Sequence, residues 1–136
     1  MTLKTIKNTP PPSAAHPQLL SITPRKRAAR LSVGIYRQFA ECRDYGFKDQ
    51  ITRSGLSIPS NITEGMERTT TKEKVRYLDI ARSSAAELRN QTYIGQEICY
   101  IPKEIAKHWI NKTKEISAML VGLERALKAA RDQVDN

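Results

Sequence analysis

Residues 54–65 read Ser54-Gly55-Leu56-Ser57-Ile58-Pro59-Ser60-Asn61-Ile62-Thr63-Glu64-Gly65, a helical pattern that carries a proline inside it. Apolar or small side chains recur at the spacing of one helical face, at Ile51, Gly55, Ile58 and Ile62. An interior proline removes one backbone hydrogen bond and crowds the carbonyl four residues earlier, at a cost of about 3 kcal/mol. The sequence therefore predicts a helix over about 48–64 with a kink at Pro59, where the serines and Asn61 can bond the freed carbonyl of Gly55. Gly65 is expected to end this helix in the left-handed conformation.

The composition favours helices and a single domain. The chain has 136 residues, of which 39% are hydrophobic and 6% aromatic, and helix-forming residues dominate its second half. No apolar run approaches the roughly 20 residues that span a bilayer, so we expect no membrane-spanning helix and predict no membrane partner. The first residues also lack the apolar core of a signal peptide. We therefore expect a cytoplasmic protein.

The first segment, residues 1–22, is predicted to be an extended arm because it is rich in proline and has no periodicity. Its few apolar residues could also pack on a neighbouring subunit. Thr23-Pro24 has the pattern of an N-cap followed by proline at the first helical position. From there an apolar stripe continues to about Asp44, where Tyr45-Gly46 is expected to end the first helix.

The third predicted helix begins at Thr70, because Thr70 and Glu73 have the spacing of a capping box. The side chains on its core-facing stripe are mainly small or apolar. A second stripe is made of Ile80, Glu87, Gln91, Ile94 and Ile98. Two stripes indicate burial on two sides, and in so short a chain another subunit is one candidate for the second neighbour. Arg53 and Asn61 are the expected partners of Glu87 and Gln91; the alternative is that Glu87 and Gln91 are both exposed.

The fourth predicted helix begins at Pro102 and carries one long apolar stripe that includes Trp109. Residues 132–136 are expected to be a frayed tail. Four amphipathic helices with short connections predict that residues 23–131 form an all-α, antiparallel up-and-down four-helix bundle.

The strongest compositional signal is the net charge of +9, with a pI near 9.8. So basic a domain is expected to attract polyanions, nucleic acid first and anionic membrane second. The alternative is that the charge only aids solubility. The cations lie opposite the apolar stripes of the first and fourth helices, which makes these side chains the candidate nucleic-acid-binding residues: Lys26, Arg27, Arg30, Arg37, Lys103, Lys107, Lys114, Arg125 and Lys128.

The sequence offers no pattern of a catalytic, metal or cofactor site. Cys42, Cys99, His16 and His108 are isolated from one another in sequence and have no neighbour at metal-ligand spacing. The Glu-x-x-His pairing of di-iron bundles, the nucleophile elbow and the phosphate loop are all missing. We therefore expect a protein that is not an enzyme and that needs no cofactor.

Residues 57–65 give the chain a specific resemblance. The nonapeptide, the Lys72-Glu73 helix start and the Ala86-Glu87-Leu88 segment with Gln91 after it resemble the 23S rRNA intervening-sequence family of four-helix bundle proteins. The likeness covers about residues 25–128. Thr63 replaces the family's usual alanine, and Lys74 stands where phenylalanine is common, so we expect the start of the third helix to be less tightly anchored.

The resemblance implies a bundle that assembles into a ring, commonly a homopentamer. Some relatives are encoded in intervening sequences of ribosomal RNA genes; others are accessory variability determinants of diversity-generating retroelements, which bind a reverse transcriptase and nucleic acid. Together with the basic charge, the resemblance implies an oligomeric RNA- or DNA-binding adaptor, for example the accessory subunit of a reverse transcriptase in a diversity-generating retroelement. The alternative is a non-catalytic protein-interaction scaffold of an rRNA intervening sequence. The residues expected to set bundle shape and subunit contact are Arg53, Ser57, Pro59, Asn61, Glu64, Gly65, Glu87 and Gln91.

Overall fold

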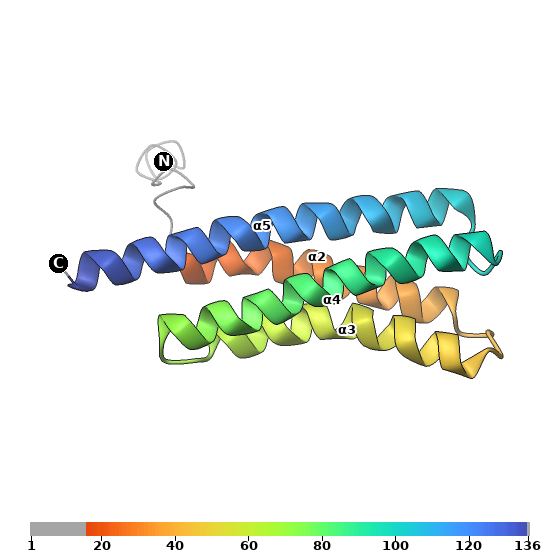
Figure 1. Cartoon of the computed structure of the whole chain (residues 1–136), viewed down its shortest axis with the longest axis horizontal. Helices are drawn as coiled ribbons and strands as arrows, with labels where there is room; N and C mark the ends of the chain where they lie inside the picture. Colours follow the sequence, from red (N-terminus) through yellow and green to blue (C-terminus); the bar gives the residue numbers. More distant parts are fainter. Residues whose placement is uncertain (1–15, 136) are drawn as a thin grey trace, which may run out of the picture.

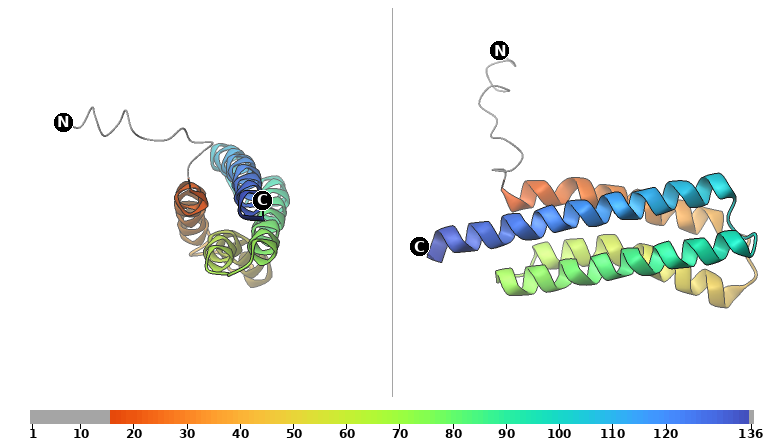
Figure 2. Two further views of the ribbon diagram at one scale, coloured as in Figure 1. Left: turned by 90° about the vertical axis from the view of Figure 1, so that its left-hand side faces the viewer. Right: turned by 45° about the horizontal axis from the view of Figure 1, so that its top comes forward.

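A computed structural model of the chain describes residues 16–135 as four helices with no strand among them (Figure 1). The helices are α2 (Pro17–Gln38), α3 (Tyr45–Met66), α4 (Thr71–Glu97) and α5 (Lys103–Asp135). Each helix packs on the next one in the chain, and α2 also packs on α5, so the four surround a common core (Figure 2). The predicted up-and-down four-helix bundle is confirmed.

The core is one continuous cluster of buried apolar side chains drawn from all four helices. The predicted stripes supply it, and Trp109 of α5 lies in it with only 4% of its surface exposed. Fully buried members include Ala28, Ile35, Ile51, Ile58, Ile62, Leu78, Ala85, Leu88, Ile116 and Leu120. Burial of these side chains is the main term that stabilises the bundle.

The bundle begins earlier than predicted, because α2 starts at Pro17 and not at Pro24. His16 is the N-cap, and its Nδ1 accepts a 3.1 Å hydrogen bond from the amide of Gln18. Pro24 lies buried inside the helix, where the cost of an interior proline is offset by the packing of this first part of α2. The predicted arm was therefore wrong for residues 16–22; its remainder lies outside the described residues.

Two further helix ends differ from the prediction. The first helix ends at Gln38, and Asp44 is instead the N-cap of α3, with Oδ1 accepting from the amide of Phe47 at 3.1 Å. An N-cap residue has non-helical backbone angles, so the first helix cannot run through Asp44. The predicted frayed tail was also wrong, because α5 continues to Asp135: no glycine or proline follows Leu127 to stop it.

Pro59 is buried inside α3, and the helix bends along its length in Figure 1, as predicted. The side-chain amide of Asn61, however, donates to the carbonyl of Ser57 at 2.8 Å and not to that of Gly55. Thr52 and Ser54 also bond the carbonyls four residues before them, at 2.7 and 3.1 Å. Such back-bonding is associated with helix bending, so the proline does not act alone.

Gly65 does not end α3 in a left-handed conformation, since no described glycine has a positive φ. It is buried inside the helix, where an added Cβ would lie 2.8 Å from Cβ of Tyr77 and 3.2 Å from the carbonyl oxygen of Lys74. Its role is thus close approach of α3 to α4. The left-handed helix end falls at Cys99 instead, with φ of 65°, after α4.

Lys74 strengthens the turn between α3 and α4. Its Nζ donates a 3.0 Å hydrogen bond to the carbonyl of Met66 at the end of α3. The side chain of Thr70 caps α4 by accepting from the amide of Glu73 at 3.2 Å, as predicted. Lys74 therefore makes a contact at this helix start that phenylalanine could not make, because only a side-chain donor can bond a helix-terminal carbonyl.

Candidate functional site

The helix α2 has the most one-sided charge of the bundle. It carries five Lys and Arg residues and no Asp or Glu, so it accounts for more than half of the net charge of +9. Lys26, Arg30 and Arg37 are exposed on the side away from the core, as their spacing predicted. Arg25, which the pattern did not single out, is exposed as well.

The helix α5 presents a second row of cations beside α2. The predicted residues Lys103, Lys107, Lys114, Arg125 and Lys128 are all exposed. Because α5 packs directly on α2, the two rows belong to neighbouring helices of one side of the bundle. The structure thus places eight of the nine predicted cations on the surface, and Arg27 alone is half-buried.

Arg27 and Arg30 line a groove between α2 and α5. Its volume is about 360 Å³, and its walls are Arg27, Arg30, Leu31, His108 and Lys112. The groove combines cations from two helices that are far apart in sequence. Lysine and arginine side chains that converge on one hollow are a recurrent feature of phosphate-binding sites.

A carboxylate pairs with two of the cations that line this groove. Glu115 of α5 forms ion pairs with Arg27 of α2 and, at 3.6 Å, with Lys112 of its own helix. The three side chains are each about one-third exposed, at 38% for Arg27, 35% for Glu115 and 34% for Lys112. Their electrostatic interaction is therefore only partly screened by water.

The sequence pattern did not single out His108 and Lys112 as members of this cluster. Both lie one helical turn apart on the flank of α5 that faces α2, between its apolar stripe and its outward cations. The available signal was the series His108, Lys112 and Glu115 at spacings of four and three residues. That series shows a shared helix face but not the helix that lies opposite.

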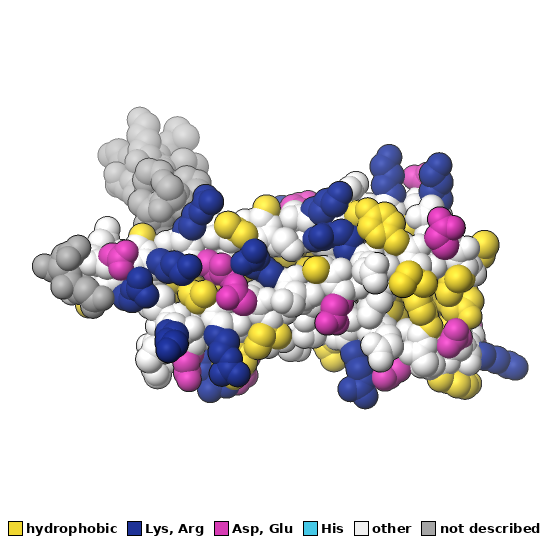
Figure 3. Space-filling view, viewed as in Figure 1, with side chains coloured by type: hydrophobic (Ala, Val, Ile, Leu, Met, Phe, Trp, Pro, Cys, Tyr) yellow, Lys and Arg dark blue, Asp and Glu magenta, His cyan; other side chains and the backbone are white. Residues whose placement is uncertain are grey.

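The face on which α4 and α5 lie has mixed charge, with Lys and Arg interspersed among Asp and Glu (Figure 3). On it, Nη1 of Arg82 lies 3.2 Å from both Asp79 and Glu124. Burial first and Asp79 second raise the pKa of Glu124 to about 7, against the opposing effect of Arg82. This cluster is thus less clearly suited to an anion than the groove between α2 and α5.

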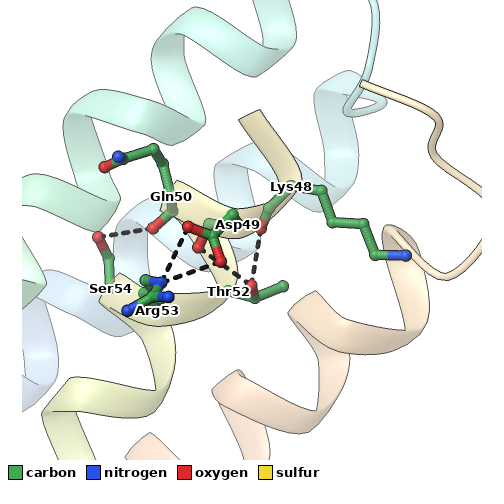
Figure 4. A network of polar contacts seen from close by, with 6 residues as sticks. All are labelled: Lys48, Asp49, Gln50, Thr52, Arg53 and Ser54. Carbon is green, nitrogen blue, oxygen red and sulfur yellow. Dashed lines mark hydrogen bonds and ion pairs between the residues drawn. The ribbon is translucent and has the colours of Figure 1, made fainter. Parts of the chain in front are cut away.

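The predicted contacts of Glu87 and Gln91 are not those that form. Arg53 is exposed and pairs with Asp49 on its own helix, with Nε 2.9 Å from both carboxylate oxygens (Figure 4). Glu87 is exposed and accepts a 3.4 Å hydrogen bond from Ser54, while the half-buried Gln91 has a buried Oε1 with no hydrogen-bond partner among the described residues. The pairing was wrong because Arg53 lies on the outer side of α3, within reach of Asp49.

The rest of this motif holds α3 against α4. The hydroxyls of Ser57 and Ser84 lie 2.8 Å apart, and Asn61 donates to Ser57 Oγ at 2.9 Å. Glu64 is exposed and pairs with Arg68. Together with the buried Gly65 and Pro59, these contacts give the motif a structural role inside one chain.

Two apolar surfaces on either side of α3 are uncovered in a single chain. One is a hollow of about 520 Å³ between α2 and α3, where Val33, Tyr36 and Leu56 surround Pro59. The other is the predicted second stripe of α4, in which Ile80, Ile94 and Ile98 are exposed. Contiguous exposed apolar side chains commonly mark interaction surfaces.

A larger hollow lies between the start of α2 and the second half of α5. Its volume is about 660 Å³, and it is lined mainly by apolar side chains, with Arg125 among them: Leu19, Leu20, Thr23, Pro24, Met119, Gly122, Leu123, Arg125, Ala126 and Ala129. Within residues 16–135 no group of three or more His, Cys, Asp or Glu side chains is arranged to hold a metal ion. None of the described helices has the length and apolar character to cross a bilayer.

The comparisons with known proteins agree with this fold. A crystal structure of a protein of unknown function from the S23 ribosomal protein family of Bacteroides thetaiotaomicron superposes with a TM-score of 0.70. The two share 24% identity, and the match covers 75% of this chain and 98% of that one. No curated protein matches the sequence. Residues 22–122 match the family described as 23S rRNA-intervening sequence protein, and the chain therefore belongs to that family.

Proposed function

We propose that this protein is a cytoplasmic, non-enzymatic adaptor that binds RNA or DNA through the cationic side formed by α2 and α5. The observation that carries the proposal is that α2 has five cations, no carboxylate and four of those cations exposed. Such a surface contacts backbone phosphates without reading base sequence. Metal-dependent turnover of RNA that survives repeated purification would contradict the non-enzymatic part.

A salt titration tests the binding. Fluorescence anisotropy with a labelled 20-nucleotide single-stranded RNA, and with its DNA counterpart, is measured at rising salt. The logarithm of the affinity is expected to fall linearly with the logarithm of salt concentration. Replacing Lys26 and Arg30 by Gln should lower that slope by about one unit for each lost phosphate contact.

The matched control is the replacement of Lys72 and Arg76 by Gln. Both are exposed cations of α4, whose main packing partners are α3 and α5 and not α2. The control removes the same net charge from another side of the bundle. Equal losses in the two double variants, or binding that does not respond to salt, would contradict an interface on α2 and α5.

We also propose that the uncovered apolar surfaces beside α3 bind other copies of the chain. The hollow of Val33, Tyr36 and Leu56 and the isoleucine stripe of α4 are different surfaces, so one can pack on the other in a head-to-tail contact. Head-to-tail contacts generate closed rings when the rotation closes. A ring, for which five copies is the first expectation, would repeat the cationic side and strengthen binding through avidity. A monomer by light scattering at high concentration would contradict this assembly.

A second candidate function is a scaffold that binds another protein. The apolar hollow of about 660 Å³ between α2 and α5 favours it, because such a surface fits an apolar peptide segment better than a phosphate chain. The first partner to test is a reverse transcriptase, which the family resemblance suggests. A pulldown from the native host before and after nuclease treatment separates the two functions, since only a protein contact survives nuclease.

A further inference from the structure

We propose that the groove between α2 and α5 is a discrete site for one backbone phosphate, and that Glu115, which pairs with two of the cations lining it, is an internal competitor for that phosphate. The inference rests on the proposed nucleic-acid binding and adds how the site is regulated. Its lining is mainly cationic or imidazole side chains, because Arg27, Arg30, Lys112 and His108 converge on a single hollow. Arg37 and Arg125, by contrast, each line a hollow whose other walls are mainly apolar.

The ion pairs show which cations are already neutralised. Glu115 pairs with Arg27 and Lys112 and so bridges the two walls of the groove. Arg30 lines the same groove but forms no ion pair within residues 16–135. The groove thus keeps an excess of positive charge after its own carboxylate has been satisfied.

A phosphate can replace this carboxylate without leaving a cation unpaired. Both are anions that accept hydrogen bonds through two oxygens, and an arginine fork matches either one. Arg27 and Arg30 are three residues apart on one helix, so their side chains are neighbours on its surface. An incoming phosphate would keep the contacts of Arg27 and Lys112 and add one from Arg30, while Glu115 turns to solvent.

The partial burial of the groove gives this exchange a measurable effect. The ion-paired side chains are about two-thirds shielded, so their interactions are stronger than those of freely exposed charges. Glu115 should therefore lower the affinity for nucleic acid more than a carboxylate elsewhere on the surface. Carboxylates beyond a Debye length of about 10 Å are largely screened at 0.1 M salt.

The test compares Glu115→Gln with Glu97→Gln in the full chain. Glu97 is an exposed carboxylate of α4, so both variants change the net charge equally. With the 20-nucleotide RNA at 0.1 M salt, we expect E115Q to bind about tenfold more tightly and E97Q less than about twofold. Adding Arg27→Gln to E115Q should abolish most of the gain. Thermal unfolding should show little change for E115Q, because pairs this exposed contribute little stability.

His108 provides an independent readout of occupancy. Its imidazole lies in the groove, whereas His16, the only other histidine, caps the start of α2. Addition of the RNA should shift the ring resonances of His108 and leave those of His16 nearly unchanged. Equal tightening by E115Q and E97Q, or equal shifts of the two histidines, would overturn the phosphate site while leaving general nucleic-acid binding intact. Wild-type protein that binds neither RNA nor DNA would overturn the proposed function itself.

Discussion

The hydroxyl of Tyr100 donates a 2.8 Å hydrogen bond to Oδ2 of Asp44, which ties the connection between α4 and α5 to the one between α2 and α3. The other carboxylate oxygen accepts from the amide of Phe47 as the N-cap of α3. The amide of Phe47 and then the hydroxyl of Tyr100 hold the pKa of Asp44 below its ordinary value. One side chain therefore joins two connections at the same end of the bundle.

Replacing Asp44 with Ala should lower the melting temperature by a few degrees at neutral pH. Tyr100→Phe should lower it by less, because it removes the hydrogen bond to Asp44 but leaves the N-cap of α3 in place. A lowered pKa in the folded state stabilises the fold above the unfolded pKa of about 3.9. That contribution is lost as pH falls through the folded value. Circular dichroism melts from pH 7 to pH 2 should show the difference between wild type and D44A shrinking below about pH 4. A difference that stays constant to pH 2 would contradict this role.

Gly65 and Gly122 form a matched pair of helical glycines. A Cβ at Gly65 meets Tyr77 at 2.8 Å, whereas a Cβ at Gly122 meets nothing within 4 Å. Gly65→Ala should destabilise the bundle by about 1–3 kcal/mol through overpacking. Gly122→Ala should stabilise it by about 0.5–1 kcal/mol, since alanine is the better helix former. Urea unfolding measures both changes in the free energy of unfolding. If the two changes have the same sign, the close approach of α3 to α4 does not explain the glycine at position 65.

Glu124 should make the bundle less stable as pH rises. Burial and Asp79 raise its pKa to about 7, so the folded state holds a proton that the unfolded state has released. Its effect is therefore absent below the unfolded pKa, grows from about pH 4.5 to 7 and is complete above that range. Glu124→Gln should match wild type near pH 4 and be more stable at pH 8 by on the order of 1–3 kcal/mol. Urea unfolding across this range measures the difference in stability between the variant and wild type. A variant that is less stable than wild type at pH 8 would show that the ion pair of Glu124 with Arg82 dominates.

Pro59→Ala should change assembly more than nucleic-acid affinity. Pro59 lines the hollow where Val33, Tyr36 and Leu56 are exposed, so its loss alters the shape of a proposed contact between copies. Light scattering should show a shifted oligomer distribution, while a short oligonucleotide should bind each chain as before. Ser60→Ala, at an exposed neighbouring position, is the control. A variant with wild-type assembly but weakened binding would move the nucleic-acid site to α3.

The sequence predicted the features that depend on one helix at a time. The stripe of Ile51, Ile58 and Ile62 and the cap at Thr70 depend on local spacing, and the structure confirms both. Gly65 was assigned to the wrong role because its reason lies on another helix, in the position of Tyr77. The start of α2 was misplaced because two proline signals compete, and only tertiary burial of Pro24 decides between them.

The candidate site was predicted less completely than the fold. The outward cations of α2 and α5 follow from helical period, and the structure exposes them. Predicting the groove requires the register of α2 against α5, because that register places Arg27 beside Glu115. No spacing within either helix carries that register, so His108 and Lys112 were missed.

The contact between α2 and α5 also has a consequence for the order of folding. Every other packed pair joins helices that follow one another in the chain through a short connection, so those contacts close small loops and can form early. The pair α2 and α5 closes the longest loop of the bundle and shares the least extensive packing. We therefore expect this contact to open locally more often than the other three, and the amide protons of α2 and α5 to exchange with solvent through that opening. The groove between α2 and α5 would then widen transiently while the other three helix pairs stay packed.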